Sequence, residues 1–573
     1  VTSEGDERAE FAVNYSMYHL MSIAPRHRAA LSVAARGLSG QTYKGAIFWD
    51  TEMFMLDFYL ACMPEVARHC LEYRVQTLPG ALDKAKSYGY AGAFYAWESV
   101  EGGKDACTDY NVTDVFTGRP MRTFFRDTQV HISAAVVYGL RKYTQYTGDD
   151  SLLQSGGARV VLECARFYMS LISKRILSDT YDLLDVMGPD EYHEHVKNNA
   201  YTNEMARMTL NYAVEVCRKY LPETDEAELM HFADASKHLK HQAPDPKTGL
   251  IEQFDGYFKL ENVLVPEVRS RLIDPREYWG GAYGVAAQTQ VIKQADVIAL
   301  LYMLGQYPAD IIAANYDYYE PRTEHGSSLS ACMYALCACA IGRRAAAYPL
   351  FLKSAEADIV GGGKQWAGLV YIGGTHPAAA GGAYMVLLYG FLGLRFEDGK
   401  EMPVRFAGSN GKPYLSIGRY LADQGEIPTG QVSMQSIRQW LREHPELRDD
   451  LLRRNQRYIF FRKGPETSSG SITSGPVGSM GSPLSSMVSL AVDRTTFPLG
   501  SVLAFDVNIP DPSSPVEEGP VSTTPLFGIG LAQDTGEAIK GRRVDLFCGK
   551  GARAAYIAGH LNGPGEIWML LAK

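Results

Sequence analysis

Apolar residues recur at helical spacing over the first two thirds of the chain. Between Gln129 and Thr147 they form one stripe, made by Ile132, Val136, Leu140 and Tyr143. The same period predicts helices at Leu152–Lys174, Asn203–Tyr220, Thr289–Leu304, Ser328–Ile341 and Arg344–Ile359. The connections are long and rich in Gly, Pro, Asp and aromatic residues. We therefore expect a mainly α domain, residues 1–398, that carries its chemistry on loops.

The pattern changes after about Asp398. Two helices are still predicted, at Ser416–Asp423 and Ser433–Asn455, before a stretch dense in Gly, Ser and Pro at Gly464–Ser486. Short strand-like segments follow at Ser489–Val492, Val502–Val507, Phe527–Leu531, Arg543–Phe547 and Glu566–Ala572. The sequence thus predicts a second, smaller β domain at residues 399–573, with the boundary near 395–405.

Composition narrows the possible functions. The 573 residues are 46% hydrophobic and carry a formal net charge of −9, which does not suit a protein that binds the phosphates of nucleic acid. No Gly-Lys pair is followed by Ser or Thr, so there is no nucleotide-binding P-loop. No apolar run reaches the length of a transmembrane helix.

The first ten residues are polar and show no secretory signal, and the nine cysteines form no CxxC pair. These features predict free thiols in a reducing compartment and a cytoplasmic location.

Proton-handling residues are concentrated in GPDEYHEHVKNNAYTN, from Gly188 to Asn203. Glu191 is a candidate general acid for cleavage of a glycosidic bond, because acidic and apolar neighbours favour the protonated carboxyl. The neighbouring tyrosine and asparagine side chains suit sugar hydroxyls. An acidic helix N-terminus capped by Asp190 is an alternative interpretation. A metal site through His193 and His195 lacks a third ligand that the sequence can assign, so we predict no metal.

This segment resembles the active-site signature of glycoside hydrolase family 65, which includes the maltose, kojibiose and trehalose phosphorylases. Other stretches fit the family in the same order over roughly residues 10–398. They are YKGAIFWDTEMFM at Tyr43–Met55, YRVQTLPGALDKAKSYGYAGAFYAWES at Tyr73–Ser99, QVHISA at Gln129–Ala134, VIKQADV at Val291–Val297, DYYEPRTEHGSSLS at Asp317–Ser330 and GGTHPAAAGGAY at Gly373–Tyr384.

The resemblance implies an (α/α)6 barrel with Glu191 as general acid. It also implies that Trp49, Asp50, Lys293 and Gln294 hold a glucose unit on the non-reducing side of the bond. A tryptophan beside an aspartate offers a pyranose an apolar face and a carboxylate, although aromatics at this spacing are also common in cores. Family members normally carry a β-sandwich domain before the barrel, which we expect this chain to lack.

The family places its nucleophile site at the segment that matches His376–Gly382. His376 would supply positive charge, and the backbone N–H groups of Gly381 and Gly382 would face an anion. No Asp or Glu occurs from Ile359 to Phe396, so inorganic phosphate is favoured over an activated water molecule as nucleophile. Phosphate is then a co-substrate, and no cofactor is implied.

One position in this segment departs from the family. Ala379 stands where many members have a phosphate-contacting serine, which puts phosphate binding in question. Ser327 and Ser328 are the nearby hydroxyls that would compensate for it.

The second part resembles the membrane-bound lytic murein transglycosylase A family through its 3D domain. The matching stretches are VRFAGSNGKPYLSIGRYLADQGEIPTGQVSMQSIRQWL, YIFFRK, GPVGSMGSPLSSMVSLAVDRTTFPLG, LAQDTGEAIKG, VDLFCG and GEIWMLL. The resemblance implies a double-psi β-barrel with Asp545 as the catalytic carboxyl, supported by Asp493 and Asp534.

Without the resemblance, three aspartates beside glycines are typical turn formers. Two departures weaken the second match. Glu537 replaces a common glycine, and the match covers only the C-terminal portion of that family. That family is also normally exported, which conflicts with the expected location.

Three functions therefore follow from the sequence. The first is inverting phosphorolysis of an α-linked glucobiose to β-glucose 1-phosphate and glucose, with a small disaccharide and phosphate as partners. The second is lytic cleavage of peptidoglycan through Asp545, which leaves 1,6-anhydro-muropeptides. The third is an inactive, sugar-binding fusion product. No motif specifies the glucosidic linkage or the oligomeric state.

Overall fold

The computed structural model divides by its internal contacts into two compact units, Val1–Asp398 and Gly399–Lys573, called the helical unit and the sheet unit below. It describes residues 6–40, 42–305, 307–360, 365–366, 370–371, 374–394, 404–444, 446–463, 476–511, 522–536, 539–549, 551–561 and 563–571. Residues 395–403 of the predicted boundary, most of the Gly/Ser/Pro-rich stretch and Glu537 lie outside these residues.

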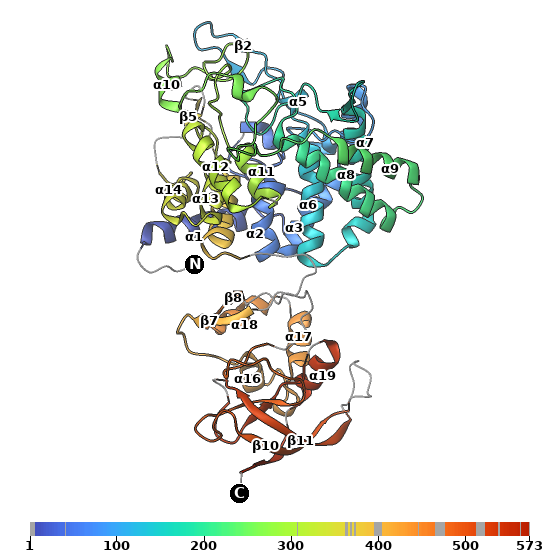
Figure 1. The fold of residues 1–573 in the computed structure, drawn as a ribbon, viewed down its shortest axis with the longest axis vertical. Coiled ribbons are helices and arrows are strands. Elements are labelled where there is room, and N and C mark those ends of the chain that lie inside the picture. The colour runs from blue at the N-terminus through green and yellow to red at the C-terminus, as the bar shows by residue number, and fades with distance from the viewer. Residues whose placement is uncertain are drawn as a thin grey trace. The chain divides into compact units, whose positions relative to one another are not determined.

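The helical unit is built almost entirely of helices joined by long loops (Figure 1). Its helices are α1 (Glu7–Ser22), α2 (Leu56–Cys62), α3 (Pro64–Gln76), α4 (Leu78–Ser87), α5 (Phe125–Thr128), α6 (His131–Thr147), α7 (Ala158–Leu171), α8 (Ala200–Tyr220), α9 (Glu226–His238), α10 (Val265–Ser270), α11 (Val297–Met303), α12 (Ala309–Tyr319), α13 (Ala331–Ala340), α14 (Arg344–Ala355) and α15 (Pro377–Met385). Two-stranded hairpins interrupt the loops: β1 (Val112–Thr113) with β2 (Pro120–Met121), β3 (Ser173–Lys174) with β4 (Tyr181–Asp182), and β5 (Gln365–Trp366) with β6 (Val370–Tyr371).

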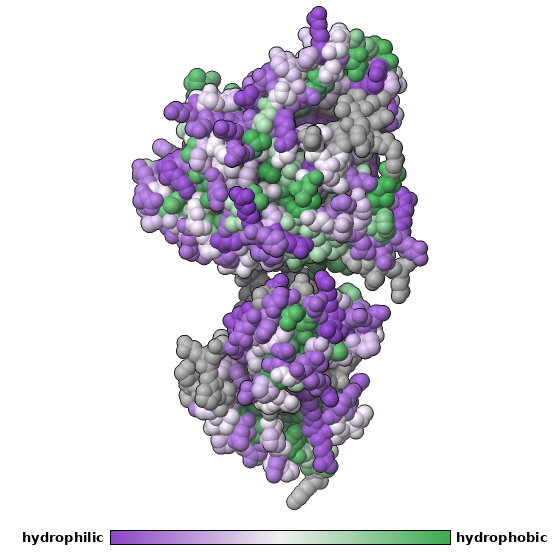
Figure 2. All heavy atoms as spheres, turned by 180° about the vertical axis from the view of Figure 1, so that it is seen from behind, coloured by the Kyte–Doolittle hydropathy of each residue, from purple (hydrophilic) through white to green (hydrophobic). Residues whose placement is uncertain are grey.

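The helices bury the stripes that the sequence predicts. In α6 all four stripe residues are buried, and burial of each such side chain contributes about 1.5–3 kcal/mol. The face drawn in Figure 2 mixes many polar side chains with apolar patches. One ion pair lies wholly inside this core, where Arg74 Nε donates to Glu52 Oε1 at 2.7 Å and both side chains are fully buried.

One predicted helix is much shorter than expected. Thr289–Leu304 was predicted as a single helix, but α11 begins only at Val297. The segment before it is extended because its backbone bonds to distant parts of the chain. Lys293 N donates to the Asp190 carboxylate at 2.9 Å, and Ala295 N donates to Ser330 Oγ at 3.1 Å. Long-range bonds of this kind are absent from the local pattern on which helix prediction relies.

The sheet unit contains a five-stranded sheet in the order β12-β9-β11-β10-β13. Its strands are β9 (Ser489–Val492), β10 (Val502–Pro510), β11 (Thr523–Asp534), β12 (Val544–Leu546) and β13 (Gly565–Met569), and only β9 and β11 pair in parallel. One face of the sheet covers a core formed by Leu490, Val492, Leu503, Phe505 and Ala532.

The other elements of this unit are a two-stranded antiparallel sheet of β7 (Val404–Ser409) and β8 (Ile459–Lys463) and four helices, namely α16 (Ile417–Asp423), α17 (Met434–Glu443), α18 (Arg448–Arg454) and α19 (Ala552–His560). The prediction of one helix over Ser433–Asn455 is wrong, because α17 and α18 are separate. Pro445 stands between them in the sequence, and proline cannot continue a helix. Among the described residues of both units, no helix combines the length and apolarity needed to cross a bilayer.

Candidate active site

Asp190 is the centre of a buried hydrogen-bond network that shapes the acidic segment. Its Oδ1 accepts from the backbone N–H groups of Tyr192 and Lys293, at 3.2 and 2.9 Å. Its Oδ2 contacts His193 Nδ1 at 2.6 Å and accepts from Gln253 Nε2 at 3.1 Å. Asp190 is 1% exposed, and the next helix, α8, begins at Ala200 with Asn199 as its N-cap, so Asp190 is a scaffold group and does not cap a helix. Long-range polar contacts explain why neither a helical nor a strand period fits this segment.

His193 and Asp296 complete the scaffold. Burial lowers the pKa of His193, but the adjacent Asp190 carboxylate outweighs this effect and raises it. Burial, reinforced by Asp190, raises the pKa of Asp296 to about 7. Gly188 is required here, because a Cβ at this position would lie 2.3 Å from Asp296 Oδ2 and 2.4 Å from Asn199 Nδ2.

Glu191 is the acid of this segment that lines a cavity of about 420 Å³ in the helical unit. Lys293 Nζ donates to Glu191 Oε2 at 2.5 Å, and Tyr278 Oη donates to the Glu191 carbonyl at 3.0 Å. Burial lowers the pKa of Lys293, but the Glu191 carboxylate outweighs this effect and raises it. The loop that replaces the predicted helix at 289–296 is therefore what brings Lys293 to Glu191.

Trp49 and Asp50, the two residues predicted to bind sugar, also line this cavity. Trp49 packs edge-on against Phe54 and His131, and its indole N–H has no partner among the described residues. An unpaired buried donor beside a cavity is a group that a ligand hydroxyl can satisfy. Burial raises the pKa of Asp50 to about 7, although the nearby Arg36 guanidinium opposes the shift.

The predicted sugar ligand Gln294 does not line the cavity. Its Nε2 donates to the carbonyl of Pro189, and its Oε1 is buried with no partner in the described part of the chain. Gln294 thus bonds to the backbone of the segment that carries Glu191 and does not face the cavity. Asn198 and Asn199, suggested as sugar ligands, likewise bond to Asp182, Asp296 and neighbouring backbone, away from the cavity.

The predicted phosphate segment divides into residues that face the cavity and residues that do not. His376 lines it, together with Ala378, Ser327 and Ser328. Ala379, at the position where the family has a serine, is fully buried, so the two neighbouring serines are the hydroxyls that the cavity offers.

Gly381 and Gly382 are buried inside α15, as its fifth and sixth residues. Their N–H groups are therefore at positions where the helix itself uses them. A Cβ on Gly381 would lie 2.2 Å from Phe54 O, and one on Gly382 2.6 Å from Cys332 Sγ. The structure gives the two glycines a packing function rather than the predicted anion contact.

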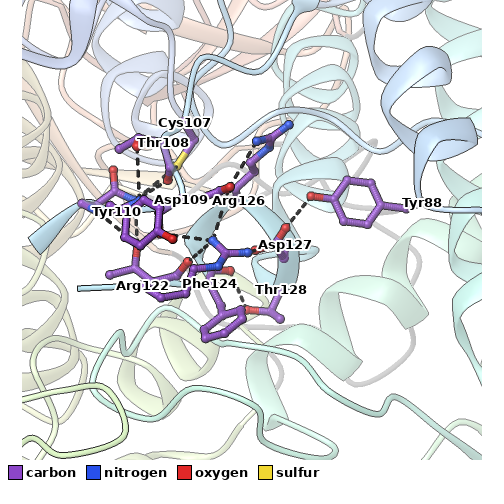
Figure 3. A network of polar contacts seen from close by, with 12 residues as sticks. Tyr88, Cys107, Thr108, Asp109, Tyr110, Arg122, Phe124, Arg126, Asp127 and Thr128 are labelled. Carbon is purple, nitrogen blue, oxygen red and sulfur yellow. Dashed lines mark hydrogen bonds and ion pairs between the residues drawn. The ribbon is translucent and has the colours of Figure 1, made fainter. Parts of the chain in front are cut away.

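A loop between Cys107 and Thr128 forms part of the cavity wall through Thr108, Tyr110, Asn111 and Val112. Figure 3 shows the polar network among residues of this loop and Tyr88. Arg122 bonds to Asp127 at 2.8 Å and to Asp109 at 3.2 Å, while Tyr88 Oη donates to Asp127 at 2.5 Å. The Arg122 bonds join residues of the loop itself, and the bond from Tyr88 ties the loop to the end of α4.

Sequence reasoning missed several cavity residues. Arg36, Tyr43, Lys44, Glu98 and Tyr278 all line it, and Lys44 Nζ lies 2.6 Å from Glu98 Oε2. Tyr43 and Lys44 have positive φ angles of 65° and 58°, a strained conformation that is common at functional sites. Three of these five residues, Tyr43, Lys44 and Glu98, lie inside stretches that carry the family resemblance, and this resemblance is the signal that could have found them.

The sheet unit gathers its three aspartates at one end of the sheet. Asp534 and Asp545 pair with opposite sides of Ala491, two residues before Asp493. Asp493 accepts from Thr495 N and Gly541 N, at 2.9 and 2.8 Å. Asp545 is half exposed, and Arg543 donates to both of its oxygens. Turn formation therefore accounts for Asp493, while Asp545 faces solvent.

Comparison with known proteins assigns both units. The model of the glycosyl hydrolase family 65 central catalytic domain matches residues 14–384, the MltA specific insert domain matches 380–462, and the 3D domain matches 488–571. Nigerose phosphorylase of Lachnoclostridium phytofermentans is 59% identical over 412 residues, 70% of this chain and 55% of that protein. The 1,2-alpha-glucosylglycerol phosphorylase of Bacillus selenitireducens is 41% identical over 69% of this chain and 53% of its own length.

A solved structure described as a kojibiose phosphorylase from the human microbiome superposes with a TM-score of 0.60 at 26% identity, covering 69% of this chain and 56% of that one. The chain thus spans about half the length of the relatives it matches. With a catalytic-domain match over most of its length and a 59% identical phosphorylase relative, the chain belongs to glycosyl hydrolase family 65, and its C-terminal part carries MltA-type and 3D domains.

Proposed function

We propose that the helical unit catalyses inverting phosphorolysis of an α-linked glucobiose, giving β-glucose 1-phosphate and glucose. One observation carries this proposal. A single cavity holds a buried acid, Glu191, an aromatic sugar platform, Trp49, and a group of anion-binding side chains, His376, Ser327 and Ser328. An acid, a sugar platform and an anion site are the parts that phosphorolysis requires.

In the proposed reaction Glu191 donates its proton to the glycosidic oxygen as the bond to the anomeric carbon breaks. A phosphate oxygen attacks that carbon from the opposite face, so the configuration inverts and the leaving sugar departs as an alcohol. Lys293 binds beside Glu191, where it orients the carboxyl and offers further donors to the glucose hydroxyls. We place this chemistry on an (α/α)6 barrel over residues 1–398, as the family resemblance implies.

Nigerose is our first candidate for the substrate, because the 59% identical relative carries the name nigerose phosphorylase. Glucosylglycerol and kojibiose come next, after the other relatives. Glucose 1-phosphate release should be measured with nigerose, kojibiose, maltose, trehalose and glucosylglycerol, with and without phosphate.

Glu191→Gln should lose about 10²–10⁴-fold in rate. Glu194→Gln, which changes an acid three residues further along that does not line the cavity, is the matched control and should stay active. Glucose release that needs no phosphate would show a hydrolase instead and would overturn the proposal.

A second activity is proposed for the sheet unit, supported by the gathering of Asp493, Asp534 and Asp545 at one sheet end. Here Asp545 would act as acid and then base on peptidoglycan, leaving a 1,6-anhydro sugar, within a double-psi β-barrel. Incubation of purified sacculi with the full chain and with Asp545→Asn tests this idea. Absence of anhydro-muropeptides from the unmodified chain would leave the sheet unit without catalysis and favour a binding function.

A further inference from the structure

Asp358 forms a pair with His376 that no sequence argument anticipated. The stretch without acidic residues runs from Ile359 to Phe396, so Asp358 lies one position before it. The backbone N–H of His376 donates to Asp358 Oδ2 at 2.6 Å, and the ring Nδ1 contacts Asp358 Oδ1. The side chain of Asp358 is 15% exposed and that of His376 is 5% exposed. A carboxylate therefore holds both the backbone and the ring of the candidate phosphate-binding histidine.

The position of Asp358 separates it from the substrate. His376 lines the main cavity, whereas Asp358 does not. Asp358 lines a separate and much smaller space of about 10 Å³, which His376 also borders, together with Tyr15, Ser16 and Ser354. It comes from the turn that follows α14, while His376 precedes α15. Asp358 thus acts on the cavity only through the imidazole, which rules it out as a base for water in this geometry.

A carboxylate at Nδ1 has two physical effects on the histidine. It fixes the ring plane and leaves Nε2 as the edge turned away from Asp358. It also favours the positively charged imidazolium, which is attracted to a phosphate dianion. α15 begins at the next residue, Pro377, and the positive end of its dipole attracts an anion but opposes a charge on His376, so the Asp358 carboxylate is the group that favours the imidazolium. The preceding residue is fixed too, because Thr375 N donates to Ser39 Oγ at 2.8 Å.

We propose that Asp358 is the positioning residue of the phosphate subsite, holding His376 charged and oriented toward the attacking phosphate. This inference rests on the proposed function, since it deepens the account of the same cavity. The pair does not take part in the proton donation by Glu191. Loss of the Asp358 charge should therefore weaken phosphate binding without weakening the recognition of the disaccharide.

The test measures inorganic phosphate binding to the full chain by titration calorimetry, and the KM for nigerose at saturating phosphate. The variants are Asp358→Asn, His376→Gln and the double variant. Asp358→Asn should weaken phosphate binding at least tenfold while the KM for nigerose stays within about twofold. His376→Gln should weaken it similarly, and the double variant should be no worse than His376→Gln, because the two residues act as one unit.

Two further variants keep the test decisive. Asp358→Glu retains the carboxylate and should keep most of the phosphate affinity. This variant can still be measured if Asp358→Asn folds poorly. Asp317→Asn removes a carboxylate from an exposed ion pair with Arg343 and should behave as the unmodified chain. Unchanged phosphate affinity in Asp358→Asn, or strictly additive losses in the double variant, would overturn the inference.

The inference and the proposed function can fail separately. Phosphate-dependent cleavage by the unmodified chain with no effect of Asp358→Asn would contradict the inference alone. Phosphate binding that depends on Asp358, without any phosphate-dependent cleavage, would contradict the proposed function alone. Failure of the unmodified chain to bind phosphate would overturn both.

Discussion

Lys293 Nζ lies 2.5 Å from Glu191 Oε2, although 102 residues separate them in the chain. Both side chains are nearly buried, at 15% and 11% exposure, so the contact is little screened by solvent. The candidate acid thus shares its pocket with a cation delivered by an extended loop. This arrangement makes Lys293 the residue whose replacement most directly tests the coupling between sugar binding and Glu191.

Replacement of Lys293 by Met should lower kcat/KM for the disaccharide by about 10- to 150-fold. A hydrogen bond to a charged group is worth about 1.5–3 kcal/mol, and its loss leaves Glu191 without its cation. Lys219→Met, which removes an exposed lysine near Asp150, is the control and should keep normal kinetics. The measurement is the steady-state kcat/KM of the two variants. If Lys293→Met has the same kcat/KM as Lys219→Met, Lys293 does not contribute to the reaction.

The sequence was sufficient for the parts of the fold that local pattern determines. The predicted helix Gln129–Thr147 is α6, and the predicted strand Ser489–Val492 is β9. Glu191, Trp49, Asp50, Lys293 and His376, which the sequence singled out, line one cavity, while their functions stay predictions. What local pattern could not show is which neighbour a residue meets across the fold.

Gly381 illustrates this limit. A glycine pair after a histidine is consistent with an anion-binding backbone, but the reason for Gly381 is the Phe54 carbonyl packed against it. Likewise Gln294 follows Lys293 directly, yet long-range bonding turns the two side chains to different sides. The Asp358–His376 pair depends on the turn after α14 meeting the start of α15, which no spacing in the sequence reveals.

Asp50 should make the stability of the helical unit depend on pH. Burial raises its pKa from 3.8 to about 7, so the folded chain keeps the proton while the unfolded chain releases it above about pH 4. The contribution of Asp50 to the free energy of unfolding is fully present below pH 3.8 and is lost as pH rises through 7. The free energy of unfolding changes by a few kcal/mol over this range.

Asp50→Asn should remove the contribution of Asp50 to the pH dependence of the free energy of unfolding. Thermal unfolding midpoints of the unmodified chain and of Asp50→Asn, taken between pH 5 and 7.5, provide the measurement. The difference between the two proteins should grow in favour of the variant as pH rises. Parallel curves would mean that Asp50 is ionised in the folded state throughout.

Arg74→Met should destabilise the helical unit by about 3–5 kcal/mol, because it leaves Glu52 buried and without a counter-charge. Arg343→Met removes an arginine from an exposed pair and should cost under about 1 kcal/mol. The double variant Glu52→Gln with Arg74→Met should recover much of the loss, since no charge then stays buried. Denaturant unfolding followed by circular dichroism compares all three. Equal effects of the two single arginine variants would contradict the argument from burial.

Asp127 should control recognition of the sugar that leaves, through the loop in Figure 3. Its carboxylate accepts from Arg122 at 2.8 Å and from Tyr88 at 2.5 Å, and the loop to which it belongs places Tyr110 and Asn111 on the cavity wall. Asp127→Asn weakens both charge-assisted bonds, so the loop is held less firmly and its contacts with the disaccharide are lost part of the time.

The expected result is a rise of about three- to tenfold in the KM for the disaccharide, matching a loss of about 0.6–1.4 kcal/mol. The KM for phosphate should not change, because His376, Ser327 and Ser328 come from other segments of the cavity wall. Asp114→Asn, which alters an exposed turn in the same loop, is the control. A rise in the phosphate KM of Asp127→Asn equal to that for the disaccharide would show general loosening of the site rather than a function in sugar recognition.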